Sequence, residues 1–344
     1  MKGFTPRQKL RVILLCHESL VPPESTAGLT PQQMLPWKSE HDVIQALRGM
    51  GHEVFPVGLS DDLGVIRKAI EELKPQIAFN LLEEFHGLAL YDQHVVSFLE
   101  LMKQPYTGCN PRGLTLAHDK ALSKKILAYH RIHVPAFAVF PLKRKVRRPS
   151  RLKFPLLVKS LLEEGSVGIA FASVVHDDEK LAERVELIHR QTNGPAIAEQ
   201  YIEGREIYAS VQGNERLRTY APWELLIERL PEGAPNIATS RLKWNYKYQE
   251  KVGVKTQAAD LTPELRKRLD HLSRRIYRAL HLSGFARLDF RLTAEGEFYL
   301  LEANPNPNIA RGEDFAEAAA HGGVSYEELL HRLLTLGLGR QLAG

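Results

Sequence analysis

The stretch that decides the fold is "FARLDFRLTAEGEFYLLEANPNPN", residues 285–308. Its two halves alternate apolar and polar residues around "TAEGE", whose Glu-Gly centre favours a tight turn. We therefore predict a β-hairpin over 285–303. If the turn centres on Glu295–Gly296, one face is apolar, and Asp289 lies opposite Glu302 on the other face. Proline cannot donate to a sheet, so the second strand ends at the two prolines that follow.

This turn position fixes the whole register of the hairpin. The predicted apolar pairs are Leu288 with Ala303, Phe290 with Leu301, and Leu292 with Tyr299. On the polar face, Arg287 is predicted to lie opposite Asn304, next to the pair of acids.

The polar face of the hairpin has two interpretations. Two carboxylates placed directly opposite each other repel, and they require a cation or a shared proton. The oxygen atoms of Asp289, Glu302 and Asn304 suit Mg²⁺ better than zinc or copper. In the alternative, Arg287 and Arg291 neutralise the acids in a solvent-exposed ladder. The hairpin alone does not decide between the two.

Length and composition indicate a globular protein of two or three domains. The chain has 344 residues, of which 44% are hydrophobic and 25% charged, with a net charge of +5. Cys16 and Cys109 cannot form a disulfide scaffold, so we expect a reducing cytoplasm. No run is long enough for a signal sequence or a membrane span. The positive charge suits a small anionic substrate. The basic run 143–153 is interpreted as a solvated connector, so neither nucleic acid nor a membrane is an expected partner.

Strands alternate with helices over the first 110 residues, which predicts parallel pairing in a small doubly wound α/β domain. No Gly-x-Gly-x-x-Gly follows the first strand, so a dinucleotide site is unsupported. The predicted strands are 11–16, 52–57 and 77–82, and the predicted helices are 38–50, 61–73 and 91–103.

From about residue 112 the sequence pattern changes to one typical of an α+β unit. We predict helices over 115–130, 177–191 and 262–281, strands over 154–160 and 169–174, a strand–turn–strand unit over 196–213, and two terminal helices. The loop "EEGSVG" (163–168) is not a Walker loop, but its backbone amides could close over an anion. Lys159 ends an otherwise apolar strand, and Lys120 lies on the preceding helix; either lysine alone is more often a solvated surface charge. Glu199 and Glu206 could accept hydrogen bonds from a ribose, or could lie on an exposed hairpin.

Taken together, these motifs resemble the ATP-grasp superfamily and, within it, the D-alanine–D-alanine ligase family. The resemblance covers about 77–335 and, more loosely, the amino-terminal region. It is carried in order by "FNLLEEFHG", "PYTGCNP", "HDKALSKK", "FPLLVKS", "EEGSVGI", "AEQYIEGREI", "KWNYKY", "GFARLDFRL", "LLEANPNP" and "AAAHGGVSYEELLHRLL". It implies an ATP-grasp fold behind a pre-ATP-grasp α/β domain, with domains at 1–111, 112–205 and 206–344. Members are often dimers, so a homodimer is expected.

The resemblance also implies a role for each matching residue. By this resemblance, Lys120 and Lys159 would contact phosphates, and Gly165, Ser166 and Gly168 would form a closing flap. Glu199 would lie at the adenine, Glu206 at the ribose and Lys247 at the γ-phosphate. Arg287 would lie at the reacting centre, and two Mg²⁺ ions, for which Mn²⁺ could substitute, would bind to Asp289, Glu302 and Asn304. The implied chemistry is ATP-dependent joining of a carboxylate to an amine through an acyl phosphate.

The substrate segments depart from the family pattern. Asn304 is followed by "PNPNIARGEDFAEAA", where the family has a Ser-Leu pair that holds the second substrate's carboxylate. An acid such as Asp314 would repel that carboxylate; Arg311 could bind one, or Glu313 and Asp314 could bind an amine. The amino-terminal Gly-Gly-x-Ser-acid motif is missing, and Glu18 is the candidate substitute. We therefore expect a ligase of amino acids or related small metabolites. The alternatives are a genuine D-alanine–D-alanine ligase and a catalytically silent nucleotide-binding protein.

Overall fold

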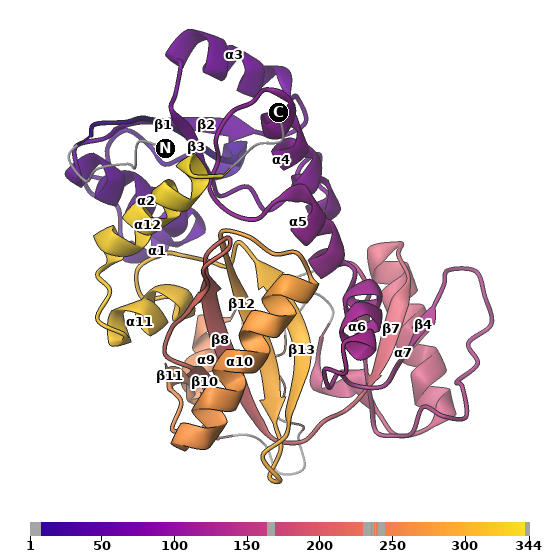
Figure 1. Ribbon diagram of the computed structural model, residues 1–344. Coiled ribbons are helices and arrows are strands. Elements are labelled where there is room, and N and C mark those ends of the chain that lie inside the picture. Colours follow the sequence, from indigo (N-terminus) through magenta and orange to yellow (C-terminus); the bar gives the residue numbers. More distant parts are fainter. Residues whose placement is uncertain are drawn as a thin grey trace.

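Three buried strands form the first sheet of the computed structural model, which describes residues 8–163, 169–229 and 245–340 together with 235, 237 and 239. β1 (Arg11–His17) pairs in parallel with β2 (Glu53–Leu59) and β3 (Ile77–Asn80), in the order β2-β1-β3. The parallel pairing predicted from strand–helix alternation is confirmed. The accompanying helices are α1 (Pro31–Met34), α2 (Lys38–Gly49), α3 (Gly64–Leu73) and α4 (Asp92–Leu101) (Figure 1).

The single helix predicted over 115–130 is wrong, because the chain forms two helices there. α5 (Pro111–His118) ends at Asp119, whose backbone is extended at φ −84° and ψ 98°. The Asp119 carboxylate accepts from the backbone N–H groups of Ala121 and Leu122, both at 2.9 Å, and so caps α6 (Lys120–Tyr129). This break makes Lys120 the first residue of α6.

The second sheet is antiparallel and has four strands. β4 (Phe137–Phe140), β5 (Leu156–Ser160), β6 (Val174–Val175) and β7 (Ala196–Gln200) lie in the order β4-β7-β5-β6, and α7 (Asp178–Thr192) packs on the sheet. The strand predicted over 169–174 is mostly wrong. Its central residues form a 3₁₀ turn, Phe171–Ser173, and only β6 pairs with β5.

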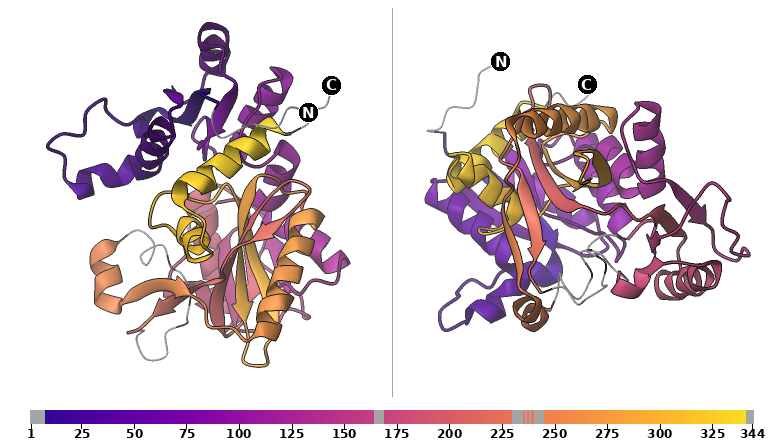
Figure 2. Two further views of the ribbon diagram at one scale, coloured as in Figure 1. Left: turned by 60° about the vertical axis from the view of Figure 1, so that its left-hand side comes forward. Right: turned by 90° about the horizontal axis from the view of Figure 1, so that it is seen from below.

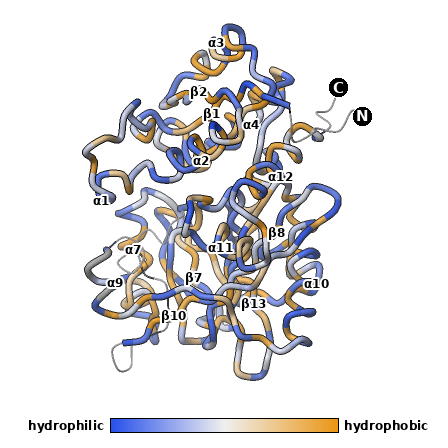
Figure 3. Tube along the Cα trace, turned by 90° about the vertical axis from the view of Figure 1, so that its left-hand side faces the viewer, coloured by the Kyte–Doolittle hydropathy of each residue, from blue (hydrophilic) through white to orange (hydrophobic). Residues whose placement is uncertain are grey.

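The third sheet has six strands. It contains β8 (Arg205–Gln212), β9 (Arg218–Thr219), β10 (Trp223–Ile227), β11 (Val254–Ala258), β12 (Phe285–Leu292) and β13 (Phe298–Pro305), in the order β11-β10-β8-β12-β13 with β9 beside β8. α9 (Tyr246–Val252) precedes β11, and α10 (Pro263–Ala279) packs on β8. In Figure 3 the trace of α10 alternates between hydrophobic and hydrophilic, as expected of a helix with one face on a sheet.

The predicted strand–turn–strand unit over 196–213 is divided between two sheets. β7 belongs to the four-stranded sheet and β8 to the six-stranded sheet, so the chain crosses from one to the other at 201–204. At Gly204 the backbone has φ +143°, and a Cβ would lie 2.1 Å from the carbonyl oxygen of Leu292. Only glycine fits this crossing without a shift of the backbone.

The predicted hairpin register is half right. Asp289 pairs with Glu302 and Arg287 with Asn304, as predicted, but Phe290 pairs with Leu300 and Leu292 with Phe298. The predicted pairs of Phe290 with Leu301 and of Leu292 with Tyr299 are therefore wrong. The cause is a β-bulge at Leu301, which has no partner on β12. The turn before it spans Thr293–Gly296, closed by a Gly296 N–H to Thr293 carbonyl bond of 3.0 Å.

The chain ends with α11 (Asp314–His321) and α12 (Tyr326–Leu338), which return to the first sheet. Figure 2 shows α12 between the amino-terminal part and the six-stranded sheet, and it packs against α2 and β3. At Gly337 a Cβ would lie 2.5 Å from the carbonyl oxygen of Tyr106, so this glycine permits the close approach. No helix among the described residues is long and apolar enough to cross a membrane.

Candidate functional site

In Figure 1, α6 lies between β13 and the four-stranded sheet. Several buried charged residues gather around this helix. Lys159 extends from β5, Glu199 from β7 and Lys124 from α6, and each residue is at most 5% exposed. Glu199 Oε1 lies 3.0 Å from Lys124 Nζ, and Oε2 lies 3.3 Å from Lys159 Nζ. Charges this deeply buried persist only when they are paired.

The pairing decides the protonation of this cluster. Burial opposes ionisation of Glu199, but the two ammonium groups outweigh burial and lower its pKa. Burial likewise opposes the charge on Lys159, yet the carboxylates of Glu199 and Glu302 raise its pKa. For Lys124 burial prevails and lowers the pKa to about 8. The cluster therefore presents a firmly charged Lys159 on the strand that precedes the glycine-rich loop.

Lys120 joins this cluster to the hairpin. Its Nζ donates to the carbonyl of Glu163 at 2.7 Å and lies 3.3 Å from Glu302 Oε1. Lys120 is 4% exposed, so the interpretation as a solvated surface charge is wrong for this residue and for Lys159. The flap residues that follow Glu163, namely Gly165, Ser166 and Gly168, lie outside the described residues, as does the side chain of Lys247 on α9.

The bulge in β13 gives the hairpin its polar face. Phe298 and Leu300 are buried, and simple alternation would turn Glu302 inward with them. The extra residue at Leu301 reverses the alternation, so Ala303 and Pro305 are buried instead. Glu302 is thereby directed to the same face as Asp289 and Asn304.

Hydrogen bonds hold Asp289 at the centre of this face. The Arg287 guanidinium donates to both carboxylate oxygens at 2.8 and 3.0 Å, and Asn304 Nδ2 donates at 2.9 Å. Burial disfavours the charge on Arg287, but Asp289 outweighs burial and raises the pKa well above its ordinary value. The guanidinium carbon also lies 4.5 Å from the centre of the Tyr208 ring. Arg287 is thus a fixed, permanent cation.

Asp289, Glu302 and Asn304 fit a magnesium ion by donor type, since all three offer hard oxygen ligands on neighbouring strands. Across the described part of the chain, no three His, Cys, Asp or Glu side chains form a group that could hold a metal. An ion at the hairpin would therefore need the Asn304 amide together with phosphate or water oxygens. Mg²⁺ commonly binds in this way, through one or two carboxylates plus substrate phosphates.

The alternative of a solvent-exposed ladder is not what forms. Arg291 is 3% exposed and turns to Glu206, with Nη2 and Oε2 3.1 Å apart. The Tyr208 hydroxyl donates to the other Glu206 oxygen at 3.0 Å. Arg291 therefore pairs with a residue of β8, and it is Arg287, not Arg291, that pairs with the metal-ligand candidate Asp289.

Of the predicted substrate residues Glu18, Arg311 and Asp314, the structure places Asp314 against Arg287. Its Oδ2 is 3.5 Å from Arg287 Nη1. Arg311 Nη2 instead lies 2.5 Å from Glu327 Oε1, and its guanidinium carbon lies 4.1 Å from the centre of the Tyr326 ring. The Arg311 guanidinium is therefore paired with residues of α12. Glu18 is exposed on a 3₁₀ turn after β1. None of the contacts described for Arg287 involves Arg311 or Glu18.

Sequence reasoning missed Lys124, Tyr208 and Glu40. Lys124 could have been found because it lies four residues after Lys120 on the same helix face, and Tyr208 because it shares a strand face with Glu206. Glu40 is 4% exposed in the first turn of α2, and burial raises its pKa to about 7. Its signal was the acidic "SEHD" at the start of that helix.

The first turn of α2 touches the segment where the family pattern breaks down. Ser39 Oγ donates to Asn308 Oδ1 at 2.7 Å, and the Arg311 backbone N–H donates to Asp42 Oδ2 at 3.0 Å. Glu40 thus lies in the same turn as two residues that hold the segment after Asn304.

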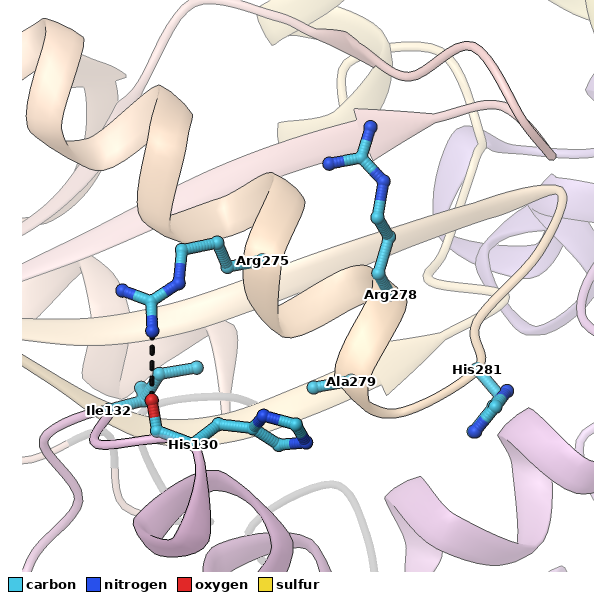
Figure 4. Close-up of a pocket in the computed structure, with 6 residues that line it drawn as sticks. All are labelled: His130, Ile132, Arg275, Arg278, Ala279 and His281. Carbon is cyan, nitrogen blue, oxygen red and sulfur yellow. Dashed lines mark hydrogen bonds between the residues drawn. The ribbon is translucent and has the colours of Figure 1, made fainter.

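A separate hollow of about 380 Å³ lies at the carboxyl ends of α6 and α10 (Figure 4). It is lined by His130, Ile132, Arg275, Arg278, Ala279 and His281. Arg275 donates to the His130 carbonyl at 2.8 Å, which satisfies the end of α6. No candidate site residue lines this hollow, so it is not the site described above.

Relatives of the chain are consistent with this geometry. A family model described as D-ala D-ala ligase C-terminus matches residues 126–335. A D-alanine–D-alanine ligase of Syntrophotalea carbinolica is 31% identical, with 89% of this chain and 92% of the relative covered. The uncharacterized protein y4sG of Sinorhizobium fredii is 28% identical, with 94% of this chain and 96% of the relative covered.

Solved structures support the fold. A D-alanine–D-alanine ligase from Bacillus anthracis, complexed with ATP, has a TM-score of 0.74 at 22% identity, covering 96% of this chain and 97% of its own. The VanG D-Ala:D-Ser ligase from Enterococcus faecalis has a TM-score of 0.71 at 20% identity, covering 96% and 100%. With the family model and the 31% identical relative, these findings establish that the chain belongs to the D-alanine–D-alanine ligase family and is an ATP-dependent, ADP-forming ligase with the ATP-grasp fold.

Proposed function

We propose that the protein joins a carboxylate to an amine through an acyl phosphate, acting on amino acids or related small metabolites. The observation that carries the proposal is the convergence of Lys120, Lys159 and Arg287 with Asp289 and Glu302 between two sheets. Fixed cations beside hard oxygen ligands are what phosphoryl transfer requires, because charge collects on oxygen atoms as the reaction proceeds.

Nucleotide contacts are assigned to the side nearest the four-stranded sheet. Lys120 and Lys159 would bind phosphate oxygens, Glu199 would lie at the adenine, and Glu206 would accept from the ribose. Gly165, Ser166 and Gly168 would cover the phosphates, and Lys247 would approach the γ-phosphate. The burial of the lysines and of Glu199 supports this assignment, because a dry environment strengthens each charge.

Asp289, Glu302 and Asn304 would hold two Mg²⁺ ions, for which Mn²⁺ could substitute. When bound, these ions would neutralise phosphate charge and align the transferring group. The task of the protein is to keep the three side chains on one face, which the bulge at Leu301 accomplishes.

In the proposed reaction, the substrate carboxylate attacks the γ-phosphorus and ADP leaves. The amine then attacks the acyl carbon, loses a proton, and inorganic phosphate leaves. Arg287 would bind developing negative charge during both steps, and its two bonds to Asp289 keep it in place.

The acceptor is proposed to be recognised as an amine. Glu313 and Asp314 follow the hairpin, and burial together with the like charge of Asp314 raises the pKa of Glu313, so an ammonium group bound beside the two acids would offset their repulsion and favour the ionised form of Glu313. Arg311, the cation that could have bound a carboxylate, is held by Glu327. A genuine D-alanine–D-alanine ligase is the second candidate, favoured by the name of the 31% identical relative.

The test is phosphate release from ATP over a matrix of D- and L-amino acids and simple amines, with Glu302→Gln as the blank. Release with a particular acid–amine pair, and the corresponding amide by mass spectrometry, would support the proposal. Product from D-alanine alone would favour the second candidate. Nucleotide binding without phosphate release across the matrix would refute ligation and favour a silent nucleotide-binding protein.

Three further features are proposed with this function. The division at 1–111, 112–205 and 206–344 would separate the pre-ATP-grasp domain from the two ATP-grasp subdomains. A homodimer is the proposed assembly, and a reducing cytoplasm the proposed compartment; Cys16 and Cys109 are both buried free thiols.

A further inference from the structure

The carbonyl of the bulge residue Leu301 has a buried cationic partner. Lys124 Nζ donates to it at 2.7 Å. Leu301 is the residue of β13 that has no partner on β12, so its backbone lies outside the regular ladder of the hairpin. A backbone carbonyl partly shielded from solvent requires a hydrogen-bond partner, and the buried Lys124 supplies one from α6.

The position of this carbonyl matters for Glu302. The peptide that begins at the Leu301 carbonyl ends at the Glu302 nitrogen, so a donor on that oxygen fixes the plane from which the Glu302 side chain departs. The bulge is also what places Glu302 on the face of Asp289 and Asn304 instead of in the core. A change in the bulge would therefore change the direction of this carboxylate.

We propose that Lys124 is a positioning residue, whose buried ammonium holds the bulge at Leu301 and thereby keeps Glu302 directed toward Asp289 and Asn304. The role rests on the proposed metal site, which it refines by naming the residue that keeps the ligand set together. Partners that orient metal ligands typically change metal affinity by 10- to 100-fold when they are removed.

A competing role for Lys124 is to neutralise Glu199, 3.0 Å away. Lys159 also pairs with that carboxylate, at 3.3 Å, so Glu199 keeps a cation when Lys124 is lost. The two roles make different predictions for Glu199→Gln. If Lys124 acts through the bulge, this variant keeps the bond to Leu301 and disturbs the hairpin less than the loss of Lys124 does.

The experiment measures Mn²⁺ binding to the nucleotide-free full chain, by electron paramagnetic resonance of free Mn²⁺, together with thermal unfolding. Lys124→Met removes the donor at similar size, and we expect Mn²⁺ affinity to fall about tenfold. Glu199→Gln should weaken Mn²⁺ binding less than Lys124→Met does, because Lys124 keeps its bond to Leu301. Lys125→Met is the matched control, because Lys125 is the next residue on α6 and is exposed.

The outcomes separate the inference from the metal site itself. Wild-type affinity in folded Lys124→Met overturns the role of Lys124 alone. Equal weakening by Glu199→Gln also overturns it, since the lysine would then act through that carboxylate. Absence of Mn²⁺ binding by the wild type overturns the metal assignment and the inference with it. Should Lys124→Met fail to fold, Lys124→Gln gives the same reading, because the shorter neutral amide would not reach Leu301.

Discussion

The charged residues on the proposed nucleotide side of this site are buried and paired with one another, whereas those on the proposed acceptor side are more exposed. On the proposed nucleotide side, Lys124, Lys159 and Glu199 are at most 5% exposed and neutralise one another between α6 and the four-stranded sheet. On the acceptor side, Arg311 is half exposed and bound to Glu327 outside the site. Removing a partner from a buried charge costs far more than changing an exposed one, so the two sides tolerate substitution differently.

This difference offers a physical reason for the departure from the family pattern that the sequence predicts on the proposed acceptor side. A buried network must change at several positions together, because each charge is compensated by another. The segment 308–314 carries fewer such constraints, because Lys38 and Asp42 of α2 bond to the backbone of Arg311, and a backbone group is present whichever side chain stands there. Substrate choice can therefore change there while the nucleotide cluster is kept.

The largest effect on activity is expected when a metal-ligand candidate is removed. Asp289→Asn or Glu302→Gln should lower Mg²⁺-dependent ATP turnover at least about a hundredfold. A bound metal is worth several kcal/mol to phosphoryl transfer, and each ~1.4 kcal/mol is a factor of ten in rate. The measurement is phosphate release at saturating ATP and Mg²⁺.

Glu295→Gln is the control for this pair, because Glu295 is exposed in the turn of the same hairpin. It should retain wild-type turnover. Undiminished turnover in both Asp289→Asn and Glu302→Gln would remove the hairpin from the mechanism.

Arg287 is the link between the two sides, since it contacts both Asp289 and Asp314. Arg287→Lys keeps the charge but loses the planar pair of bonds to Asp289, and we expect kcat to fall roughly tenfold to a hundredfold. The KM for ATP should change little. Arg311→Lys is the matched control on the acceptor side, and steady-state kinetics that show equal losses in both variants would contradict the assignment.

Substitution of the acids on the proposed acceptor side should change the KM of the amine substrate and leave the KM for ATP unchanged. Glu313→Gln and Asp314→Asn should raise the KM of the amine substrate about tenfold, because each removes a charge that would attract an ammonium group. The KM for ATP should stay within twofold. Glu317→Gln, one turn further along α11, is the control, and an amine KM that falls in the acid variants would indicate a carboxylate-bearing acceptor.

The sequence predicted the outer half of the hairpin register, from Ala286 to Asp289, because polar and apolar residues alternate there without interruption. It could not predict the bulge. Leu300 and Leu301 are adjacent and equally apolar, so alternation does not show which of them is buried. The capping role of Asp119 was missed for a related reason, since "AHDKALSK" continues a helical pattern through the break.

Long-range pairings were beyond the reach of periodicity altogether. The partners of Lys124 are Glu199 and Leu301, 75 and 177 residues away, and no local pattern links them. The family resemblance named Lys120 and Lys159 by motif, but it did not name Lys124, because the contacts of Lys124 depend on α6 lying between β7 and β13.

The smallest expected effect concerns two buried glutamates, one with cationic partners and one whose charge is disfavoured by burial. Glu199 has cationic partners that lower its pKa, whereas burial of Glu40 raises its pKa from 4.5 to about 7. A raised pKa means that the stability linked to Glu40 is fully present below pH 4.5 and is lost as the pH rises through about 7. Glu40→Gln cannot ionise, so at pH 8 it should be more stable than wild type, by on the order of 2 kcal/mol. At pH 5 the difference should nearly vanish. Thermal unfolding of both proteins between pH 5 and pH 8 measures this, and parallel pH profiles would show that Glu40 has a cation that compensates it, as Glu199 does.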